Sequence, residues 1–328
     1  MIGVTGANGL LGSFIIRKLL EDKLPFIAIK RIDSDISLVQ DIAEQIVWRH
    51  ADINDPVSLH EAFTGLTHVI HAAAMVSFSP KDSKKIFLTN VEGTHHVVNA
   101  CLSHGVQRLV YISSVAALGR QKNDTIITEE NKWVNGSVNS VYGHSKYQAE
   151  LEIFRGQEEG LHSVIVNPSV ILAPTDWNKS SARLFKYVWQ ENKFYINGVL
   201  NYIDVRDVAS IVCSLLHSTV ENQRFIVNSG CISFQEFFSK VATLLNKKPP
   251  SIKLTKPYVK IIAFLEALRS AVTGSNPLIT KETARLTDTA FVYDSTKIKK
   301  TLNFEFQSIN NTLQWCCDGY IKKINDKK

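Results

Sequence analysis

A tyrosine and a lysine four positions apart, Tyr142 and Lys146, are the first residues of this chain whose types and spacing suggest chemistry. In a helix, positions i and i+4 lie one above the other, so the phenol and the ammonium would share one face. A free tyrosine has a pKa of about 10, but a fixed positive charge favours the phenolate and lowers that value. A tyrosine and lysine placed in this way could move protons.

The spacing alone does not identify the pair, because Tyr293 and Lys297 repeat it. A tyrosine and a lysine on the exposed face of an amphipathic helix would also share this spacing without any chemistry. The second pair lies far beyond the expected sheet, and Asp294 is typical of the N-cap of a short helix. We expect no cofactor there, so the choice of Tyr142 depends on the elements that surround it.

A glycine turn near the start of the chain predicts a dinucleotide site. Residues 2–5 are typical of a short buried strand, residues 13–21 of a helix, and T-G-A-N-G-L-L-G at residues 5–12 lies between them. Such a turn lets the backbone approach a pyrophosphate, whose charge is met by the free N–H groups and dipole of the helix N-terminus. The expected cofactor contacts in this turn are Gly6, Asn8, Gly9, Leu10, Leu11 and Gly12.

The strand and helix patterns then alternate. Strands are expected at residues 26–30, 46–49, 68–71, 108–112 and 163–167, with long helices at 81–104, interrupted by a possible cap at Thr89-Asn90, and at 140–158. This alternation predicts an α/β fold, a doubly wound parallel sheet of the Rossmann type, in which ligands bind at the carboxyl ends of the strands. The candidate ligand contacts at those ends are Asp52, Ile53, Ala72, Ala73, Ala74, Ser113 and Ser114. Close packing would equally explain the three alanines, and capping of the strand end would equally explain the two serines.

Arg31 indicates which dinucleotide the chain binds. It follows the second expected strand, where the adenosine ribose of a dinucleotide should lie. An acid at this point favours the free 2′-hydroxyl of NAD, whereas an arginine accommodates the 2′-phosphate of NADP. Asp33 could reach the ribose instead, so we expect NADP and keep NAD as the alternative.

The second half of the chain predicts a smaller, mostly helical substrate lobe. Residues 173–199 are rich in aromatics and lack a βα pattern, residues 202–216 have a helix-like pattern, residues 251–254 resemble a short strand, and residues 322–328 a frayed tail. We expect a dinucleotide-binding domain at 1–170, with 202–229 returning to it. The substrate lobe would then comprise 171–201 and 230–328.

Composition excludes several classes of protein. With 45% hydrophobic and 21% charged residues, the chain has an ordinary globular composition. No run approaches the roughly 20 apolar residues of a membrane span, the most apolar helical candidate at 258–272 carries charges, and the first strand leaves no room for a signal peptide. The net charge of +6 is scattered rather than gathered in a stripe. We expect a cytoplasmic protein that binds a small-molecule substrate, with no nucleic acid, membrane or metal partner; the cysteines and histidines show no metal-ligand spacing.

Together, these motifs resemble the extended short-chain dehydrogenase/reductase family, the NAD(P)-dependent epimerase/dehydratase superfamily. The resemblance runs along roughly the first two-thirds of the chain. Its motifs are the glycine turn at 5–12, Asp52-Ile53, residues 71–74, residues 90–94, Ser113-Ser114, Y-G-H-S-K at 142–146 and Y-I-D-V-R-D-V at 202–208.

The resemblance implies roles for individual residues. Tyr142 would be the general acid/base, Lys146 would lower its pKa and bind the nicotinamide ribose, and Ser114 would hydrogen-bond the reacting oxygen, leaving Ser113 as a neighbour of the cofactor. Tyr142 and Lys146 would thus also contact the cofactor. Further implied cofactor contacts are Asn90, Asn167 and Val170. The family frequently has arginine where this chain has Asn167, which leaves the contacts of that loop open.

Within the family, the sequence favours a reductase. Sugar-nucleotide enzymes commonly carry an arginine just before the segment at 202–207 to bind a diphosphate, and this chain has Leu200-Asn201 there. The aromatic lobe and Arg31 resemble the dihydroflavonol-reductase and 3β-hydroxysteroid-dehydrogenase-like branch. We expect NADP-dependent reduction of a carbonyl, or the reverse oxidation, on a small, fairly apolar substrate. The alternatives are an NAD-dependent nucleotide-sugar epimerase/dehydratase and a catalytically silent dinucleotide sensor. The resemblance also implies a homodimer through helices 81–104 and 140–158.

Overall fold

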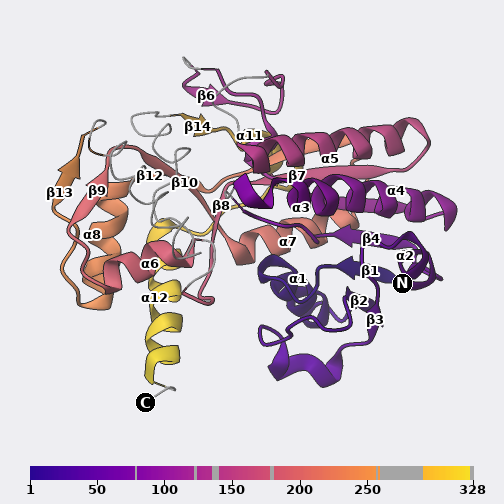
Figure 1. Ribbon diagram of the computed structural model, residues 1–328, viewed down its shortest axis with the longest axis horizontal. Helices are drawn as coiled ribbons and strands as arrows, with labels where there is room; N and C mark the ends of the chain where they lie inside the picture. The colour runs from indigo at the N-terminus through magenta and orange to yellow at the C-terminus, as the bar shows by residue number, and fades with distance from the viewer. Residues whose placement is uncertain are drawn as a thin grey trace.

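The computed structural model describes residues 1–77, 80–121, 124–134, 140–177, 181–255, 258 and 291–325. Its centre is a seven-stranded sheet in the order β11-β7-β5-β4-β1-β2-β3, and every neighbouring pair is parallel (Figure 1). This confirms the predicted doubly wound sheet. Its strands are β1 (Ile2–Thr5), β2 (Phe26–Lys30), β3 (Trp48–His50), β4 (His68–His71), β5 (Arg108–Ile112), β7 (Ser163–Pro168) and β11 (Gln223–Val227).

Helices cover both faces of this sheet because its strands are apolar on both sides. Helices α1 (Leu10–Glu21) and α7 (Val205–Leu216) pack against one face. Helices α2 (Pro56–Ala62), α4 (Gly93–Ser103) and α5 (Val141–Glu158) pack against the other. Strand β5 divides its side chains accordingly, with Val110 in the first core and Leu109 and Tyr111 in the second. The face that carries Tyr111 is therefore the face that carries α5.

The long helix expected at residues 81–104, with an interruption at Thr89-Asn90, is divided at that point. It consists of the 3-10 turn η2 (Pro80–Asp82), α3 (Ser83–Phe87), the π-helical turn η3 (Leu88–Glu92) and α4. Asn90 lies in the π turn, where its side chain accepts from the Met75 N–H at 2.7 Å and donates to the Met75 carbonyl at 2.9 Å and to Ser145 Oγ at 3.0 Å. The wider turn thus joins the loop after β4 to helix α5.

Helix α5 begins where the sequence predicted. Ser140 is its N-cap and accepts from the Gly143 N–H at 2.8 Å. A Cβ at Gly143 would lie 2.6 Å from the Ala116 carbonyl oxygen, in the 3-10 turn η4 (Val115–Ala117) that follows Ser114. Glycine is therefore required here, because the first turn of α5 packs directly on the backbone beside Ser114.

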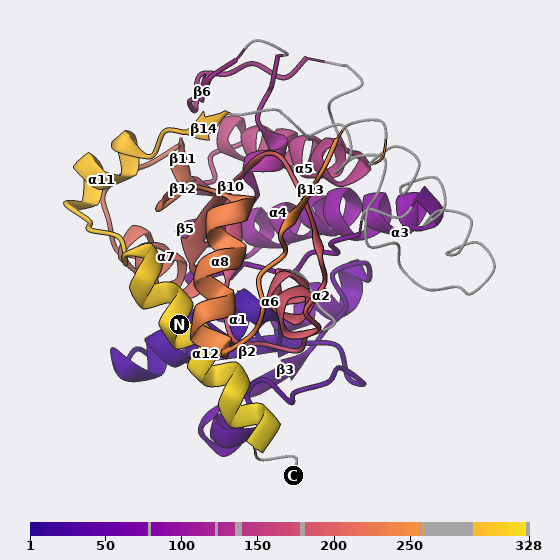
Figure 2. The same ribbon diagram turned by 90° about the vertical axis from the view of Figure 1, so that its left-hand side faces the viewer.

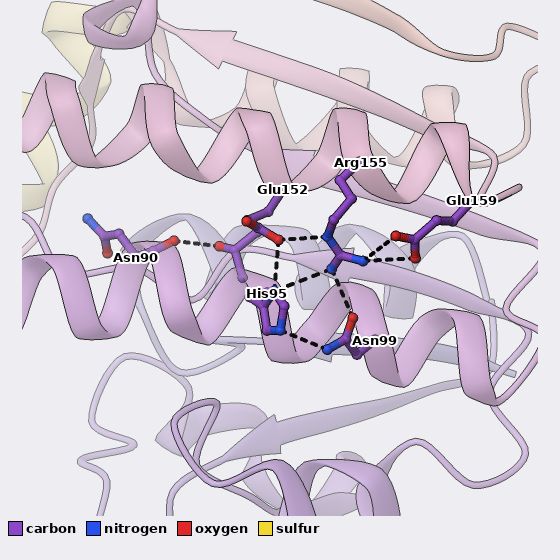
Figure 3. Close-up of polar contacts among 7 residues, drawn as sticks. Asn90, His95, Asn99, Glu152, Arg155 and Glu159 are labelled. Carbon is purple, nitrogen blue, oxygen red and sulfur yellow. Dashed lines mark hydrogen bonds and ion pairs between the residues drawn. The ribbon is translucent and has the colours of Figure 1, made fainter.

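A polar network on the outer surface holds α5 against α4 (Figure 3). Arg155 donates to Glu152 at 2.9 Å, to Glu159 at 2.8 Å and to Asn99 at 2.8 Å, and His95 lies 2.8 Å from Glu152. Exposed ion pairs contribute little individually. Their joint effect is to fix the relative positions of the two helices.

Much of the described second half of the chain packs beside the sheet as a lobe (Figure 1). Its core lies among α6 (Ala182–Trp189), α8 (Phe234–Leu245) and α12 (Ile309–Asn325), and Figure 2 shows α8 and α12 side by side. The remaining elements are the strands β6 (Ile126–Ile127), β8 (Val170–Leu172), β9 (Phe194–Ile196), β10 (Val199–Asp204), β12 (Gly230–Ser233), β13 (Ile252–Leu254) and β14 (Val292–Tyr293), the helix α11 (Thr296–Leu302) and the 3-10 turn η1 (Gln40–Gln45). Among all described helices, none combines the length and apolar character needed to cross a bilayer.

Several expected boundaries differ from the structure. Strand β3 lies at 48–50 rather than 46–49. Residues 202–204 belong to strand β10, because Tyr202 pairs with Val170 and Asp204 with Leu172, so the helix begins only at Val205. Helix α12 includes residues 322–325, which were expected to fray. The amphipathic helix expected at 258–272 lies outside the described residues, apart from Tyr258, and the proposed division into two domains stays a prediction.

Asp204 joins the sheet layer to the lobe. Its fully buried carboxylate caps α7 by accepting from the Arg206 N–H at 2.9 Å, pairs with the Arg206 guanidinium at 2.6 Å and accepts from Thr312 Oγ1 on α12 at 2.8 Å. The Arg206 guanidinium in turn lies 4.0 Å from the centre of the Trp315 ring. One carboxylate therefore connects α7 to the last helix of the chain.

Replacing Asp204 by alanine should lower the free energy of unfolding by about 2–4 kcal/mol, because several charge-assisted hydrogen bonds are lost in a buried setting. Urea unfolding measures this. The matched control is Asp41→Ala, which removes the exposed Asp41–Arg17 pair and should cost less than about 1 kcal/mol. Equal losses in the two variants would contradict a joining role for Asp204.

Candidate functional site

The glycine turn between β1 and α1 is packed so closely that side chains are excluded. Gly6 has a φ of +68°, and a Cβ there would lie 2.7 Å from the Ala73 backbone. A Cβ at Gly12 would lie 2.1 Å from the Gly6 carbonyl oxygen. The Gly9 N–H donates to that same oxygen at 2.9 Å, and the Ser13 N–H donates to the Gly9 carbonyl at 2.8 Å. The turn therefore presents bare backbone at the N-terminus of α1.

This turn lines a cleft of about 470 Å³ at the carboxyl ends of β1, β2 and β4. Its size, its small side chains and the helix N-terminus fit a dinucleotide. Leu10, Leu11 and Gly12 form the first turn of α1 and are not among the lining residues. The predicted cofactor contacts that line the cleft are Gly6, Asn8, Gly9, Arg31, Asp52, Ile53, Ala72, Ala73 and Ala74.

A second hollow, of about 550 Å³, shares Arg31 and Asp52 with the cleft and also includes Asp33. The side chains of Arg31 and Asp33 are exposed, and within the described part of the chain neither has an ion-pair or hydrogen-bond partner. Both groups considered for the ribose end of the cofactor thus border the same space and are free to bind a ligand.

The three predicted catalytic residues lie just after β5 and in the first turns of α5, and none of them is among the residues that line this cleft. Ser114 follows strand β5; its Oγ accepts from the Ala116 N–H at 3.1 Å and also hydrogen-bonds the Tyr142 hydroxyl. Ser113 Oγ is buried and has no hydrogen-bond partner among the described residues. An unpartnered buried hydroxyl calls for an explanation, and a bound ligand would supply its missing partner.

Lys146 is 1% exposed and donates to Tyr111 Oη at 2.7 Å and to the Ile112 carbonyl at 2.8 Å. Burial lowers the pKa of Lys146 to about 7, while the negative charge of Glu150 acts in the opposite direction. The ammonium is therefore held from the side of strand β5.

The pKa of Tyr142 differs from the expectation. Burial raises it to about 12, and the hydrogen bond from Ser114 offsets only part of this rise. The expected lowering by Lys146 is absent in this arrangement, because the ammonium is engaged with Tyr111 and Ile112. Tyr142 is therefore a protonated phenol that can serve as a proton donor.

Glu150 is a residue of this site that the sequence reasoning missed. Its carboxylate is fully buried, accepts from Asn167 Nδ2 at 2.6 Å and pairs with Arg224 at 3.1 Å. Because it follows Lys146 by four positions, just as Lys146 follows Tyr142, the i, i+4, i+8 spacing could have found it.

The amide nitrogen of Asn167, which was expected to contact the cofactor, is hydrogen-bonded within the protein. Its amide nitrogen also donates to the Ser114 carbonyl at 2.9 Å, so it connects the serine backbone to Glu150. Its side-chain oxygen has no hydrogen-bond partner among the described residues. A contact between this oxygen and a cofactor stays a prediction.

Two other expected cofactor contacts lie away from the cleft lining. The Asn90 amide is engaged with Met75 and Ser145, and Val170 lies on β8 with 39% of its surface exposed. Their contacts with a cofactor also stay predictions.

The second tyrosine and lysine with the same spacing do not share a helix. Tyr293 lies on β14, whereas Lys297 lies on α11 and donates to the Arg224 carbonyl at 3.0 Å. Asp294 does bind the Thr296 N–H at 2.8 Å, one residue before the cap position at Ser295. In the described ranges, no three His, Cys, Asp or Glu side chains gather as metal ligands would.

Comparison with known sequences places this site in context. The model of the "3-beta hydroxysteroid dehydrogenase/isomerase family" matches residues 3–202. A Synechocystis protein named "Putative dihydroflavonol 4-reductase" is 28% identical over 97% of this chain and 95% of its own length. Cinnamoyl-CoA reductase 1 of Oryza sativa subsp. japonica is 27% identical over 79% of this chain and 82% of its own length.

Solved structures show the same fold. The crystal structure of gox2253 superposes with a TM-score of 0.84 at 27% identity, covering 98% of each chain. A UDP-glucose 4-epimerase from Thermotoga maritima, solved with UDP-glucose, has a TM-score of 0.79 at 18% identity over 99% of each chain. At that identity the second likeness concerns the fold alone.

Gly12→Ala should weaken NADPH binding about tenfold or more, because the turn must move away from the new methyl group and a loss of about 1.4 kcal/mol corresponds to a factor of ten. The measurement is a titration of NADPH fluorescence. Gly319→Ala is the control, since its Cβ would lie 2.5 Å from Pro174 in the lobe. It should lower stability without changing NADPH affinity; an equal loss of affinity in both variants would show that the turn is not the binding site.

Proposed function

The chain belongs to the 3-beta hydroxysteroid dehydrogenase/isomerase family and is an NAD(P)-dependent oxidoreductase of the extended short-chain dehydrogenase/reductase type; from this premise we propose that it reduces a carbonyl group on a small, fairly apolar substrate with NADPH. The observation that carries the proposal is the placement of Tyr142 and Lys146 on one face of α5, whose first turn packs against the backbone that follows Ser114. The reverse reaction, oxidation of the alcohol, would use the same residues.

The residues of the cleft would hold the cofactor in a fixed orientation. The N–H groups at the start of α1 would bind its pyrophosphate, Arg31 its 2′-phosphate, and the small side chains of Ala72 and Ala73 would let it lie against the backbone. The bound dinucleotide supplies the hydride. The protein would position the cofactor and exclude water from the cleft.

Ser114 and Tyr142 would act on the substrate oxygen. A hydroxyl from each would hydrogen-bond the carbonyl oxygen, and Tyr142 would give it a proton as negative charge develops there. A phenol whose pKa is about 12 holds its proton at neutral pH, as an acid must. The Lys146 ammonium, whose third N–H is not used by Tyr111 or Ile112, would then stabilise the phenolate that remains.

The lobe supports an apolar substrate in preference to a nucleotide sugar. At the point where sugar-nucleotide enzymes commonly have an arginine, Asn201 is 7% exposed and donates to the Phe291 carbonyl at 2.9 Å. Leu200, next to it, lies in the aromatic core of the lobe. These two residues supply no cation for a diphosphate, so a nucleotide-sugar epimerase is the less favoured reading and a silent dinucleotide sensor the least favoured.

Two further expectations are kept as proposals. The chain would work in the cytoplasm, and two copies would associate through the outer surfaces of α4 and α5, where the Arg155 network lies (Figure 3).

Tyr142→Phe should lower kcat for carbonyl reduction by about a hundredfold or more, because the proton donor is lost, while leaving NADPH affinity near the wild-type value. Stopped-flow oxidation of NADPH with a panel of apolar aldehydes and ketones measures the effect. Tyr187→Phe, which removes a lobe hydroxyl bonded to the Phe194 carbonyl, is the control. Unchanged kcat in Tyr142→Phe would refute the assignment.

Arg31→Ala should weaken NADPH binding about tenfold while leaving NADH binding unchanged, because only NADPH carries the 2′-phosphate that the guanidinium would bind. Isothermal titration with both cofactors makes the comparison. Asp33→Ala serves as its counterpart and should not weaken NADPH binding. If Asp33→Ala instead abolished NADH binding and Arg31→Ala affected neither cofactor, NAD would replace NADP in the proposal.

A further inference from the structure

A continuous chain of buried polar side chains runs beneath the site, from the glycine turn to Lys146. Its members come from five different elements, β1, β4, α4, β5 and α5, and each is at most 1% exposed. The proposed reaction uses only the last of them. The chain consists of Thr5, His71, Thr94, Tyr111 and Lys146.

The distances identify the donors and acceptors. Thr94 Oγ1 donates to the Asn90 carbonyl at 2.6 Å, which uses its single proton. The contact of 3.1 Å between Thr94 Oγ1 and His71 Nε2 therefore requires a proton on Nε2. His71 Nδ1 then accepts from Thr5 Oγ1 at 2.7 Å. Burial, with the Lys146 charge, lowers the pKa of His71 to about 3, so the imidazole is neutral and has this single tautomer.

The same reasoning fixes the direction at Tyr111. Thr94 also acts on the Tyr111 hydroxyl, and a hydrogen bond between them would run from Tyr111 to Thr94, because the Thr94 proton is already donated to the Asn90 carbonyl. Burial raises the pKa of Tyr111 well above its ordinary value, so the phenol keeps its proton. Its oxygen is left to accept from the Lys146 ammonium at 2.7 Å. Tyr111 thus presents an acceptor oxygen to Lys146, and not its proton.

We propose that Tyr111, oriented by Thr94, is a positioning residue that holds the Lys146 ammonium at the cofactor end of α5. A lysine ammonium has three N–H donors. Tyr111 and the Ile112 carbonyl bind two, which leaves one for the cofactor or for Tyr142. The proposed function supplies only the task of Lys146; the positioning itself follows from these contacts.

Other charged and titratable groups near Lys146 also influence its pKa. Glu150 raises the pKa of Lys146 through its negative charge, and Arg224, the ion-pair partner of Glu150, lies beyond it. Tyr142 and Tyr111 are neutral phenols, and His71 is a neutral imidazole. Tyr111 and the Ile112 carbonyl are thus the described groups that hydrogen-bond the ammonium directly.

The test is the protonation of Lys146, read from the ¹³Cε chemical shift of lysine-labelled protein and assigned with Lys146→Arg. Tyr111→Phe removes an acceptor from a buried cation, so the midpoint of the Lys146 titration should fall by about one to two pH units. Thr94→Val, which does not touch Lys146, should shift it in the same direction, and Thr94→Ser should restore the wild-type midpoint. The pH above which turnover declines through loss of the ammonium should fall in parallel.

Tyr320→Phe is the matched control, because it also removes a fully buried phenol hydroxyl, here one bonded to the Ala173 carbonyl at 2.9 Å. It should lower stability without moving the Lys146 midpoint. An unchanged midpoint in Tyr111→Phe, or an equal shift in Tyr320→Phe, would overturn the proposal; if Tyr111→Phe does not fold, Thr94→Val and Thr94→Ser decide it. The chemical shift needs no turnover, so failure of the proposed function would leave this result standing.

Discussion

The burial of one ammonium group, that of Lys146, is the constraint on which the site depends. A cation removed from water is costly unless acceptors and an opposite charge surround it. Strand β5 supplies Tyr111 and the Ile112 carbonyl, and α5 supplies Glu150 one turn away. Glu150 in turn needs Asn167 and Arg224. The catalytic helix is thereby fastened to three neighbouring strands of the sheet, β5, β7 and β11.

Buried polar side chains also connect the glycine turn to the helix that carries Tyr142 and Lys146. Thr5, at the end of β1, begins the hydrogen-bonded chain that reaches Lys146 through His71, Thr94 and Tyr111. A cofactor bound on the turn would therefore lie above side chains whose orientations are already fixed. Such preorganisation is what electrostatic catalysis requires.

The sequence predicted what local patterns determine. Strand and helix periodicity, together with the glycines between β1 and α1, was sufficient for the parallel sheet and the cleft. It failed where a partner distant in the sequence decides the outcome. Residues 202–204 are strand because β8 and β12 pair with them, although their pattern resembles a helix.

The sequence also failed to predict the buried polar contacts, because these too depend on partners distant in the chain. Tyr111 lies in an apolar run and looks like a packing residue, and only the fold brings Lys146 to its hydroxyl. The predicted lowering of the Tyr142 pKa assumed a free ammonium, and burial dominates instead. Glu150 alone could have been found, because its spacing from Lys146 repeats the spacing that drew attention to Tyr142.

Transfer of label from the cofactor is the measurement that tests the central claim most directly. NADPH deuterated at nicotinamide C4 would be mixed with an excess of enzyme and an apolar carbonyl substrate for a single turnover, and the product analysed by mass spectrometry. Net reduction predicts one deuterium on the carbinol carbon for each NADP released, when the face of C4 that is used carries the label. Tightly retained NAD that returns to its starting state, with no net cofactor consumed, would contradict the account and indicate an epimerase.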